Sequence, residues 1–519
     1  MTVLQRDRSD SQEARKRKKL TWVGIAILGT AAAFAPLEVV ANNPHDIGHP
    51  ERILILIGLL WVSAILAAGF LVRRGARPTS ATYSVFLVTV LMMRGGALLS
   101  ALGEVLGWVV LVVLPVVATY LISRIERHDA LDALFLALCA FLIAGPVTSL
   151  VREASQAGID ETVHHDGSAL ALSHRPDIFL VVLDGYAGNL TLESDFGLDR
   201  STVIRRFEKI GFEVPVHAWS AYPATRSSLP SLLDMSFPLE SGGRVTALTE
   251  KRLSDMIGGS NSVSSILRAE GYELVMVESG WSGSRCGPEV DICIPAPIMD
   301  EAMFSVAERS LVGKPILRSM GYAFTVGAQH TMTWLDANGP SLSEDSRPSF
   351  VFAHVMVPHP PFFLDDSCRT RFGRERNGVQ FVRPGDELLE RRSAYLEQTE
   401  CVDEFVLDLT GMIEPDDVVV VVGDHGTDQR NQLVRDPETW SRTDLEERFN
   451  VFLAVRDGAE CSVGDPVILP NIFRRVLSCI ANPDLEDLEP RMFKYAGVDD
   501  PAPEVSEVAI SDVSSLLSS

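Results

Sequence analysis

Long apolar stretches in the first 150 residues constrain this chain more than any other feature. They are residues 20–40, 53–72, 81–122 and 130–150. Each is long enough for a helix that crosses a membrane, which needs about 20 apolar residues. A cleaved signal peptide would be followed by a soluble sequence, whereas further apolar stretches follow the first one here. We therefore predict transmembrane helices over residues 20–150, preceded by a basic cytoplasmic N-terminus at residues 1–19.

The third apolar stretch, residues 81–122, is about twice as long as one crossing requires. Arg94 and Glu104 interrupt it, and we interpret both as residues near helix ends that reach the interface. The alternative is that they form a functional pair inside the membrane. Basic clusters precede the first stretch and also lie at residues 73–77 and 123–127. Basic loops face the cytoplasm, so all three clusters lie inside only if this stretch crosses twice. The prediction is a bundle of about five transmembrane helices in the plasma membrane, with four as the alternative, and an extracytoplasmic C-terminal part.

The part of the chain after the helices has the composition of a soluble domain. The net charge of the whole chain is −23, which argues against nucleic acid as a partner. Six of the seven cysteines lie in this part, and Cys139 of the last apolar stretch is left unpaired. An even number suits disulfides in an oxidising compartment, and no C-x-x-C spacing points to a zinc knuckle. Cys286 and Cys293 are near enough to close a small loop, but the sequence leaves the connectivity open.

Short continuous apolar runs alternate with helical patterns between residues 176 and 497. The runs are residues 177–183, 272–278, 349–354, 417–422 and 450–455. Runs of this kind suit strands that are buried on both faces, and their alternation with helices predicts a mostly parallel sheet. We therefore predict a three-layer α/β domain at residues 176–497. Residues 151–175 are interpreted as a linker, and the acidic, serine-rich residues 498–519 as a disordered tail.

Residues that can bind a metal ion follow three of the predicted strands. Asp184 comes directly after the first strand, His354 ends the third, and Asp424 and His425 come after the fourth. Ligand sites in such sheets lie beyond the carboxyl ends of the strands, so we expect these side chains to share one site. Carboxylate and imidazole ligands suit Mn²⁺, Zn²⁺, Mg²⁺ or Ca²⁺, and the sequence does not choose among them.

Thr225 is the predicted nucleophile of this site. It stands just before a helical pattern at residues 227–233, where the N–H groups of a helix N-terminus favour an anion. A hydroxyl that is bound to a divalent cation becomes available as an alkoxide. The alternative is that Thr225 or Ser227 only caps the helix.

Several segments together resemble a known superfamily. They are RPDIFLVVLDGY, AYPATRSSLPSLL, FAHVMVPHPPF, VVVVGDHG and LEERFNVFLAV. In this order, over roughly residues 175–480, they look like the alkaline phosphatase/sulfatase superfamily. The nearest resemblance is to its bacterial membrane-anchored sulfatase-like branch, which includes the phosphoethanolamine and phosphoglycerol transferases such as lipoteichoic acid synthase.

The resemblance implies a role for each site residue. Asp184, Thr225, Asp424 and His425 would hold one divalent metal ion, with Thr225 as the nucleophile. His359, in the segment PHPP, would contact the phosphate or a second ion. His354 is a weaker candidate for the same substrate-binding wall.

The sequence departs from the superfamily's sulfatases at the nucleophile. Those enzymes carry Cys/Ser-x-Pro-x-Arg and convert the first residue to formylglycine, whereas this chain has TRSSL at residues 225–229. We therefore predict a metal-dependent phosphoester transferase or hydrolase that acts on membrane lipid head groups or cell-envelope glycans. A sulfatase or a phosphatase that releases a free anion is the alternative, and a non-catalytic binding module is a third reading. The sequence leaves the oligomeric state open.

Overall fold

The computed structural model describes most of the chain. The described residues are 20–43, 47–124, 128–156, 170–311, 313, 323–342, 347–371, 387–457, 462–482, 485–495 and 502–518. The predicted basic N-terminus at residues 1–19 and most of the predicted linker lie outside them. The chain divides into two compact units. The helical unit comprises residues 1–160 and 302–320, and the α/β unit comprises residues 161–301 and 321–519.

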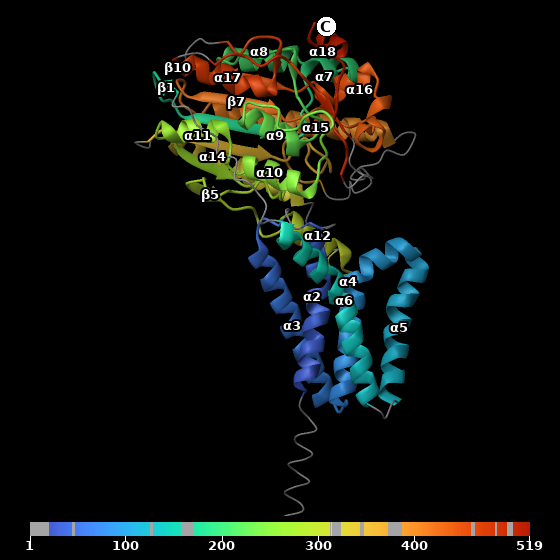
Figure 1. The fold of residues 1–519 in the computed structure, drawn as a ribbon. Helices are drawn as coiled ribbons and strands as arrows, with labels where there is room; N and C mark the ends of the chain where they lie inside the picture. The colour runs from blue at the N-terminus through green and yellow to red at the C-terminus, as the bar shows by residue number, and fades with distance from the viewer. Residues whose placement is uncertain are drawn as a thin grey trace, which may run out of the picture. The chain divides into compact units, whose positions relative to one another are not determined.

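Five helices form the N-terminal part of the helical unit (Figure 1). They are α2 (Trp22–Asn42), α3 (Pro50–Arg73), α4 (Pro78–Leu102), α5 (Glu104–Arg124) and α6 (His128–Gln156). The stretch at residues 81–122 is therefore two helices, and Gly103 lies between them with a φ of 76°. By length and composition, four of the described helices are apolar enough to cross a membrane, namely α2, α3, α5 and α6. The fifth helix, α4, is the one that carries Arg94.

Arg94 has a partner that its sequence position did not predict. Its guanidinium forms an ion pair with Glu38 of α2 and lies over the Phe34 ring, 5.0 Å from the centroid. The interpretation of Arg94 as a residue near a helix end that reaches the interface did not include this partner. Facing helices brought the two charges together, and pairing lowers the cost of holding them in an apolar bundle.

A segment far along the chain also belongs to the helical unit. Ala302 and Val306 of α12 (Glu301–Arg309) pack in one apolar cluster with Phe34 and Met93. The chain therefore returns to the helices after the first part of the α/β unit. This return could not be predicted locally, because α12 is short and only partly apolar.

The α/β unit is built on a six-stranded sheet with the order β5-β4-β6-β2-β7-β8. The strands are β2 (Ile178–Leu183), β4 (Glu273–Val277), β5 (Ile292–Ile294), β6 (Ser349–Val355), β7 (Val418–Gly423) and β8 (Leu453–Arg456). All neighbours pair in parallel except β8, which runs antiparallel to β7. The prediction of a mostly parallel α/β sheet is confirmed.

Both faces of the sheet are covered by helices (Figure 1). Alternate residues of the central strand β2 enter opposite cores, because successive side chains of a strand point to opposite faces. Ile178, Leu180 and Val182 join one core, and Phe179 and Val181 join the other. The first core is closed by α9 (Thr225–Leu233), α11 (Ser262–Ala269) and α17 (Leu469–Ile480), and the second by α8 (Ser201–Lys209), α14 (Ala323–Leu342) and α15 (Glu387–Thr410). The three-layer arrangement follows from this burial on both sides.

The C-terminal segment is folded, which corrects the predicted disordered tail. Strand β12 (Ser506–Glu507) pairs with β11 (Phe493–Lys494), and helix α18 (Ile510–Leu517) follows. Val513 and Leu516 of this helix are buried in a cluster that includes Trp219. The prediction was wrong because it rested on the acidic, serine-rich composition. A few apolar side chains in this segment lie on one face of the helix and are buried.

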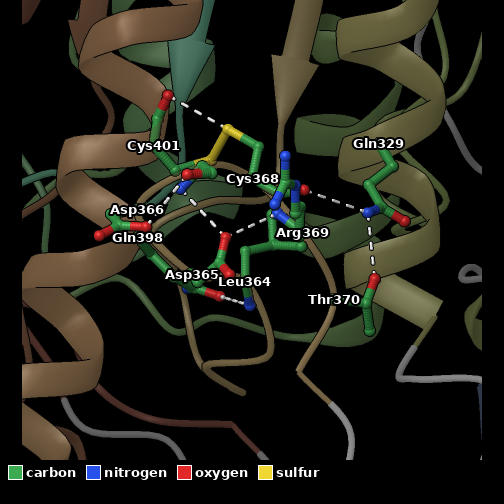
Figure 2. The surroundings of a disulfide bond; sticks show 10 residues. Gln329, Leu364, Asp365, Asp366, Cys368, Arg369, Thr370, Gln398 and Cys401 are labelled. Carbon is green, nitrogen blue, oxygen red and sulfur yellow. Dashed lines mark hydrogen bonds between the residues drawn. A yellow bond between two sulfur atoms is a disulfide. The ribbon is translucent and has the colours of Figure 1, made fainter.

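Disulfides cross-link the α/β unit. Cys286 bonds to Cys293, as their spacing suggested, and Cys368 bonds to Cys401 of α15. Cys479 is also disulfide-bonded. Cys139 of the helical unit is free and buried, as predicted. Figure 2 shows the Cys368–Cys401 bridge, beside which Gln398 of α15 accepts a hydrogen bond from the Leu364 N–H.

Candidate active site

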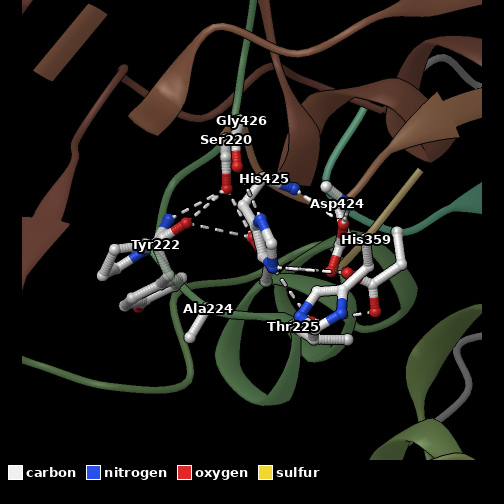
Figure 3. A network of polar contacts seen from close by, with 12 residues as sticks. Ser220, Tyr222, Ala224, Thr225, His359, Asp424, His425 and Gly426 are labelled. Atoms are coloured by element: carbon white, nitrogen blue, oxygen red, sulfur yellow. Dashed lines mark hydrogen bonds and ion pairs between the residues drawn. The ribbon is translucent and has the colours of Figure 1, made fainter. Parts of the chain in front are cut away.

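Thr225 is the first residue of α9 and does not cap it. The N-cap position is Ala224, and no side chain caps this helix end. The Thr225 hydroxyl instead lies 3.1 Å from Nε2 of His425 and 3.5 Å from Oδ2 of Asp184 (Figure 3). The side chain is therefore available for chemistry at the end of a helix whose N–H groups favour negative charge.

Asp184, Asp424 and His425 form the metal-competent group that the sequence predicted. Asp184 follows β2, and the other two follow β7, its direct neighbour in the sheet. His425 Nε2 lies 3.6 Å from Oδ1 of Asp184 and 3.4 Å from Oδ2 of Asp424. One ligand atom from each residue lies within 4.8 Å of the others, a spacing that suits one ion.

The hydrogen bonds of these carboxylates leave one oxygen of each for a cation. Oδ1 of Asp424 accepts hydrogen bonds from the N–H groups of Gly185 and His425, both at 2.9 Å. Oδ2 of Asp424 and Oδ1 of Asp184 are buried and have no hydrogen-bond partner among the described residues. Buried polar atoms without a partner are costly, and a divalent cation between them would remove that cost. The residues therefore fit a divalent metal ion.

His425 presents a lone pair to the same point. Its Nδ1 lies 2.8 Å from the carbonyl oxygen of Gly426. A carbonyl only accepts, so Nδ1 carries the proton and Nε2 is left unprotonated. Burial, together with the nearby Arg448, lowers the pKa of His425 to about 3, which keeps the ring neutral. Neutral imidazole is the form that binds metals.

The two carboxylates have opposite pKa shifts. Burial raises the pKa of Asp184, but the surrounding His359, His354 and His425 outweigh it and hold the pKa well below its usual value. Burial and the Asp184 charge together raise the pKa of Asp424. Two buried carboxylates this close repel one another, which is a further reason for a cation between them.

The glycines beside the Asp424-His425 pair are required by close backbone contacts. A Cβ at Gly423 would lie 2.3 Å from the Tyr186 carbonyl oxygen, and one at Gly426 would lie 2.0 Å from the Glu447 carbonyl oxygen. Neither neighbour can move aside, because both are backbone atoms. The turn that aims Asp424 and His425 at one point is therefore fixed on both sides.

Arg448 is a site residue that the sequence did not single out. It is buried in α16 (Arg442–Phe449), where its Nε donates to the Pro223 carbonyl at 2.5 Å and its Nη1 donates to the Gly426 carbonyl at 3.0 Å. It thus ties the loop before Thr225 to the loop that carries His425. Only its place in the segment LEERFNVFLAV could have drawn attention to it.

The two other predicted histidines lie on different sides of the site. His359 lines a cavity that Gly185 and His425 also line, and its Nδ1 donates to the Pro360 carbonyl (Figure 3). His354 is fully buried in β6, with Nε2 3.2 Å from Oδ2 of Asp184 and Trp281 packed edge-on against its ring. His359 therefore faces open space, whereas His354 faces Asp184.

A second metal-like group lies away from this site and can be set aside. Glu278, Cys286 and Cys293 are close enough together to hold an ion. The two cysteines form a disulfide, however, and so offer no thiolate ligand.

Comparison with known proteins finds one family whose model matches part of this chain. The model of the sulfatase family matches residues 211–459. The matched segment includes Thr225, His359, Asp424 and His425, and it begins after Asp184. Among the curated protein sequences, none matches this chain.

Solved structures that are similar to the chain share little sequence with it. The integral membrane lipooligosaccharide phosphoethanolamine transferase A from Neisseria meningitidis is 14% identical, with 88% of this chain and 95% of that chain covered and a TM-score of 0.41. The zinc complex of the C-terminal periplasmic domain of EcEptC from Escherichia coli is 13% identical. The match covers 64% of this chain and 92% of that chain, with a TM-score of 0.39. The phosphonate monoester hydrolase of Agrobacterium radiobacter is 12% identical. The match covers 63% of this chain and 82% of that chain, with a TM-score of 0.41.

The similarity to the sulfatase family rests on the match of its model to residues 211–459. That segment carries Thr225 and the Asp424-His425 pair, and the sheet around them is mostly parallel. This segment is therefore similar to the sulfatase family, and apolar helices precede it in the sequence.

Proposed function

We propose that the protein is a membrane-embedded, metal-dependent phosphoester transferase or hydrolase that uses Thr225 as its nucleophile. One observation carries the proposal. The Thr225 hydroxyl lies within 3.1–3.5 Å of His425 and Asp184, in the same group that offers two carboxylate oxygens to a cation. A hydroxyl that only stabilised the fold would have no need of these neighbours.

The residues of the site would divide the work as follows. Asp184, Asp424, His425 and Thr225 would hold a divalent cation, which would lower the pKa of the hydroxyl and offset charge on the phosphoryl oxygens. Thr225 Oγ1 loses its proton and attacks phosphorus, an O–P bond forms, and the bond from phosphorus to the leaving alcohol breaks in line. The departing oxygen takes up one proton, so the alcohol leaves neutral and the protons balance. His359 stabilises the phosphoryl oxygens from the open side.

A second displacement would regenerate the enzyme. An acceptor hydroxyl or water loses its proton and attacks the phospho-threonine, the bond between phosphorus and Thr225 Oγ1 breaks, and Oγ1 takes up a proton to restore the hydroxyl. His354 would keep Asp184 in position, since it is buried against that carboxylate. Whether an alcohol or water arrives decides between transferase and hydrolase.

The membrane helices favour a substrate from the cell envelope. Four of the helices in the described part of the chain are long and apolar enough to cross a membrane, whereas one would suffice as an anchor. We propose that the protein lies in the plasma membrane with its α/β unit outside the cytoplasm. The disulfides of that unit support an oxidising compartment. Lipid head groups and envelope glycans are the phosphoesters and acceptors within reach there. Mn²⁺, Zn²⁺, Mg²⁺ and Ca²⁺ all remain candidates for the cation.

Sulfate-ester hydrolysis is the second candidate function. The matched family is named for sulfatases, which favours it. The absence of the formylglycine motif around Thr225 opposes it, because a threonine cannot form the gem-diol nucleophile of those enzymes. We therefore place phosphoryl transfer first.

Mass spectrometry of Thr225 tests the proposal directly. The purified full-length protein is incubated with Mn²⁺ or Zn²⁺ and with envelope lipid extract, quenched in acid and digested. A mass increase on the Thr225 peptide that corresponds to a phosphoryl-linked group supports the proposal, and the mass names the group. A Thr225→Ala protein is the matched control and should carry no adduct. An unmodified Thr225 with every donor, in a protein that turns over the same donors, would refute covalent catalysis by this residue.

A further inference from the structure

A cavity of about 140 Å³ adjoins the site, and part of its lining is formed by residues that the proposed chemistry does not use. Gly185, His359 and His425 form the wall that it shares with the catalytic residues. Arg391 and Gln429 belong to the rest of its lining. The space is larger than a single water molecule needs. The cavity can therefore hold several atoms of a ligand beside His359 and His425.

Arg391 is a buried charge without an ion-pair partner among the described residues. Its side chain belongs to α15, and the residue is only 5% exposed. Its Nη2 lies 3.5 Å from the Asp428 carbonyl oxygen, and its Nε and Nη1 have no hydrogen-bond partner in the described part of the chain. Burial lowers the pKa of Arg391, yet a guanidinium stays protonated at neutral pH. A buried, unpaired charge is costly and therefore indicates a function.

The acidic groups nearest to Arg391 are engaged elsewhere. Glu447 accepts hydrogen bonds from Thr427 at 2.8 Å and from Gln432 at 2.8 Å, and it pairs with Arg430. The Asp428 carboxylate accepts from the Leu433 N–H at 3.3 Å. Both acids attract Arg391 through space, but no described carboxylate contacts its guanidinium. Its Nε and Nη1 without a described partner distinguish it from Arg448 in the same lining, whose Nε and Nη1 both donate to backbone carbonyls.

Gln429 adds an acceptor to the same cavity. It is 5% exposed, and its side-chain oxygen has no hydrogen-bond partner among the described residues. An amide oxygen accepts from a hydroxyl, whereas the guanidinium donates to an anion. Phe362 and Tyr395 also belong to the lining, and both are almost fully buried. The donor of Arg391 and the acceptor of Gln429 therefore suit a ligand that carries an anion and hydroxyl groups.

We propose that Arg391 is a specificity-determining residue that binds a second anionic group of the substrate, on a hydroxylated leaving group or acceptor. The ligand class is a sugar or polyol that carries a phosphate or a carboxylate. This inference rests on the proposed function only in placing the reacting phosphoryl group at Thr225. Binding of the anionic sugar itself is independent of that chemistry.

Calorimetry with three matched sugars tests the inference. Glucose 6-phosphate, glucuronate and glucose share a ring and differ at one substituent, which is a phosphate, a carboxylate or a neutral hydroxyl. Each is titrated into the metal-loaded, full-length protein in detergent micelles. Arg391→Gln should raise the Kd of the anionic sugars about tenfold to a hundredfold, the range expected for the loss of hydrogen bonds to a charged group. Whichever anionic sugar binds more tightly shows whether the site takes a phosphate or a carboxylate.

Two controls make the result specific. Arg392, the next residue of α15, lies over the Phe196 ring at 5.6 Å and is not part of the pocket lining, so Arg392→Gln should bind all three sugars as the wild type does. A second comparison needs no variant: calorimetry measures binding without turnover, so its result is independent of whether Thr225 forms an adduct. Equal affinities in the wild type and Arg391→Gln, or glucose binding as tightly as the charged sugars, would overturn the inference. If the anionic sugars bound only at the metal centre, the wild type and Arg391→Gln would bind them with equal affinity.

The melting temperature of Arg391→Met separates a binding role from a structural one. A buried arginine without an ion-pair partner contributes little to the free energy of unfolding. A methionine of similar length should therefore leave the melting temperature unchanged or raise it. A large fall would mean that Arg391 holds the fold together, and the inference would then fail even if sugar binding were lost.

Discussion

Nε2 of His425 lies 3.1 Å from Oγ1 of Thr225, although the two residues are 200 positions apart in the chain. The proton on Nδ1 of His425 is held by the Gly426 carbonyl, so the nitrogen that faces Thr225 is a free lone pair. A nucleophilic hydroxyl and a metal-binding imidazole thus share one point in space. This relationship, and the contacts that support it, can be tested by mutation and by metal removal.

Removal of the Thr225 hydroxyl should abolish turnover. Thr225→Ala should lower kcat by about 10⁴-fold or more, since loss of a covalent nucleophile has effects of this order or larger. Thr225→Ser retains the hydroxyl and should keep measurable activity. Metal content by mass spectrometry should stay close to wild type in both, because three ligands remain. Near-normal turnover in Thr225→Ala would show that the nucleophile lies elsewhere.

Metal removal should destabilise the protein. Asp184 and Asp424 are both buried, and without a cation their charges repel. A chelator should therefore lower the melting temperature, and readdition of a divalent ion at about 100 times its Kd should restore roughly 2.7 kcal/mol. Asp424→Asn removes one ligand and part of the repulsion, so its melting temperature should respond little to the chelator. A wild-type protein that melts identically with and without chelator would argue against the site.

Loss of the Arg448 side chain should lower kcat more than it changes substrate binding. Its two backbone contacts fix the loop before Thr225 against the loop of His425, and misplacement of reacting groups by about 1 Å can cost about 10²-fold. We expect Arg448→Met to lower kcat by about that factor. Arg442 of the same helix bonds to Ser515 at the surface, so Arg442→Met serves as the control. Equal kinetics for the two variants would contradict this role.

Asp403 should be essential for stability. Arg200 is buried and pairs with Asp403, and the Tyr186 hydroxyl donates to the same carboxylate at 2.5 Å. Asp403→Ala leaves Arg200 buried and unpaired, which should cost about 3–5 kcal/mol in denaturant unfolding of the α/β unit. The neighbouring Glu404 pairs with Arg206 at the surface, and Glu404→Ala should cost only about 0–1 kcal/mol. A small loss for Asp403→Ala would mean that the pair is not desolvated.

The Cys368–Cys401 disulfide should stabilise the protein more than the Cys286–Cys293 disulfide. The first spans 33 residues and the second 7, and longer loops lose more chain entropy when cross-linked. We expect paired serine variants to cost roughly 3–4 and roughly 2–3 kcal/mol of unfolding free energy respectively. The longer bridge also ties the loop after His359 to α15, where Gln398 donates to the His359 carbonyl at 3.4 Å. Its loss should therefore also reduce kcat, whereas loss of the shorter bridge should not.

Much of the candidate site followed from local sequence. Strands that are buried on both faces read as continuous apolar runs, and parallel strands put their carboxyl ends at one edge. Asp184, Asp424 and His425 could therefore be grouped from the order of residues alone. Thr225 was found by its place before a helix. Arg391 and Arg448 were not found, because both lie in helices among many other charged residues, and nothing local distinguishes a buried arginine from an exposed one.

The sequence by itself determined the order of the parts. Apolar helices, strand ends with metal ligands and a threonine at a helix start are all properties of short segments, which local composition specifies. The tertiary structure decided which residues meet. It paired Arg94 with Glu38, placed His354 behind Asp184, folded the C-terminal segment onto Trp219, and put Arg391 in a cavity beside the site with no described carboxylate to pair with. These outcomes depend on how helices pack across the sheet and against each other, which is a sum over many contacts between residues distant in sequence.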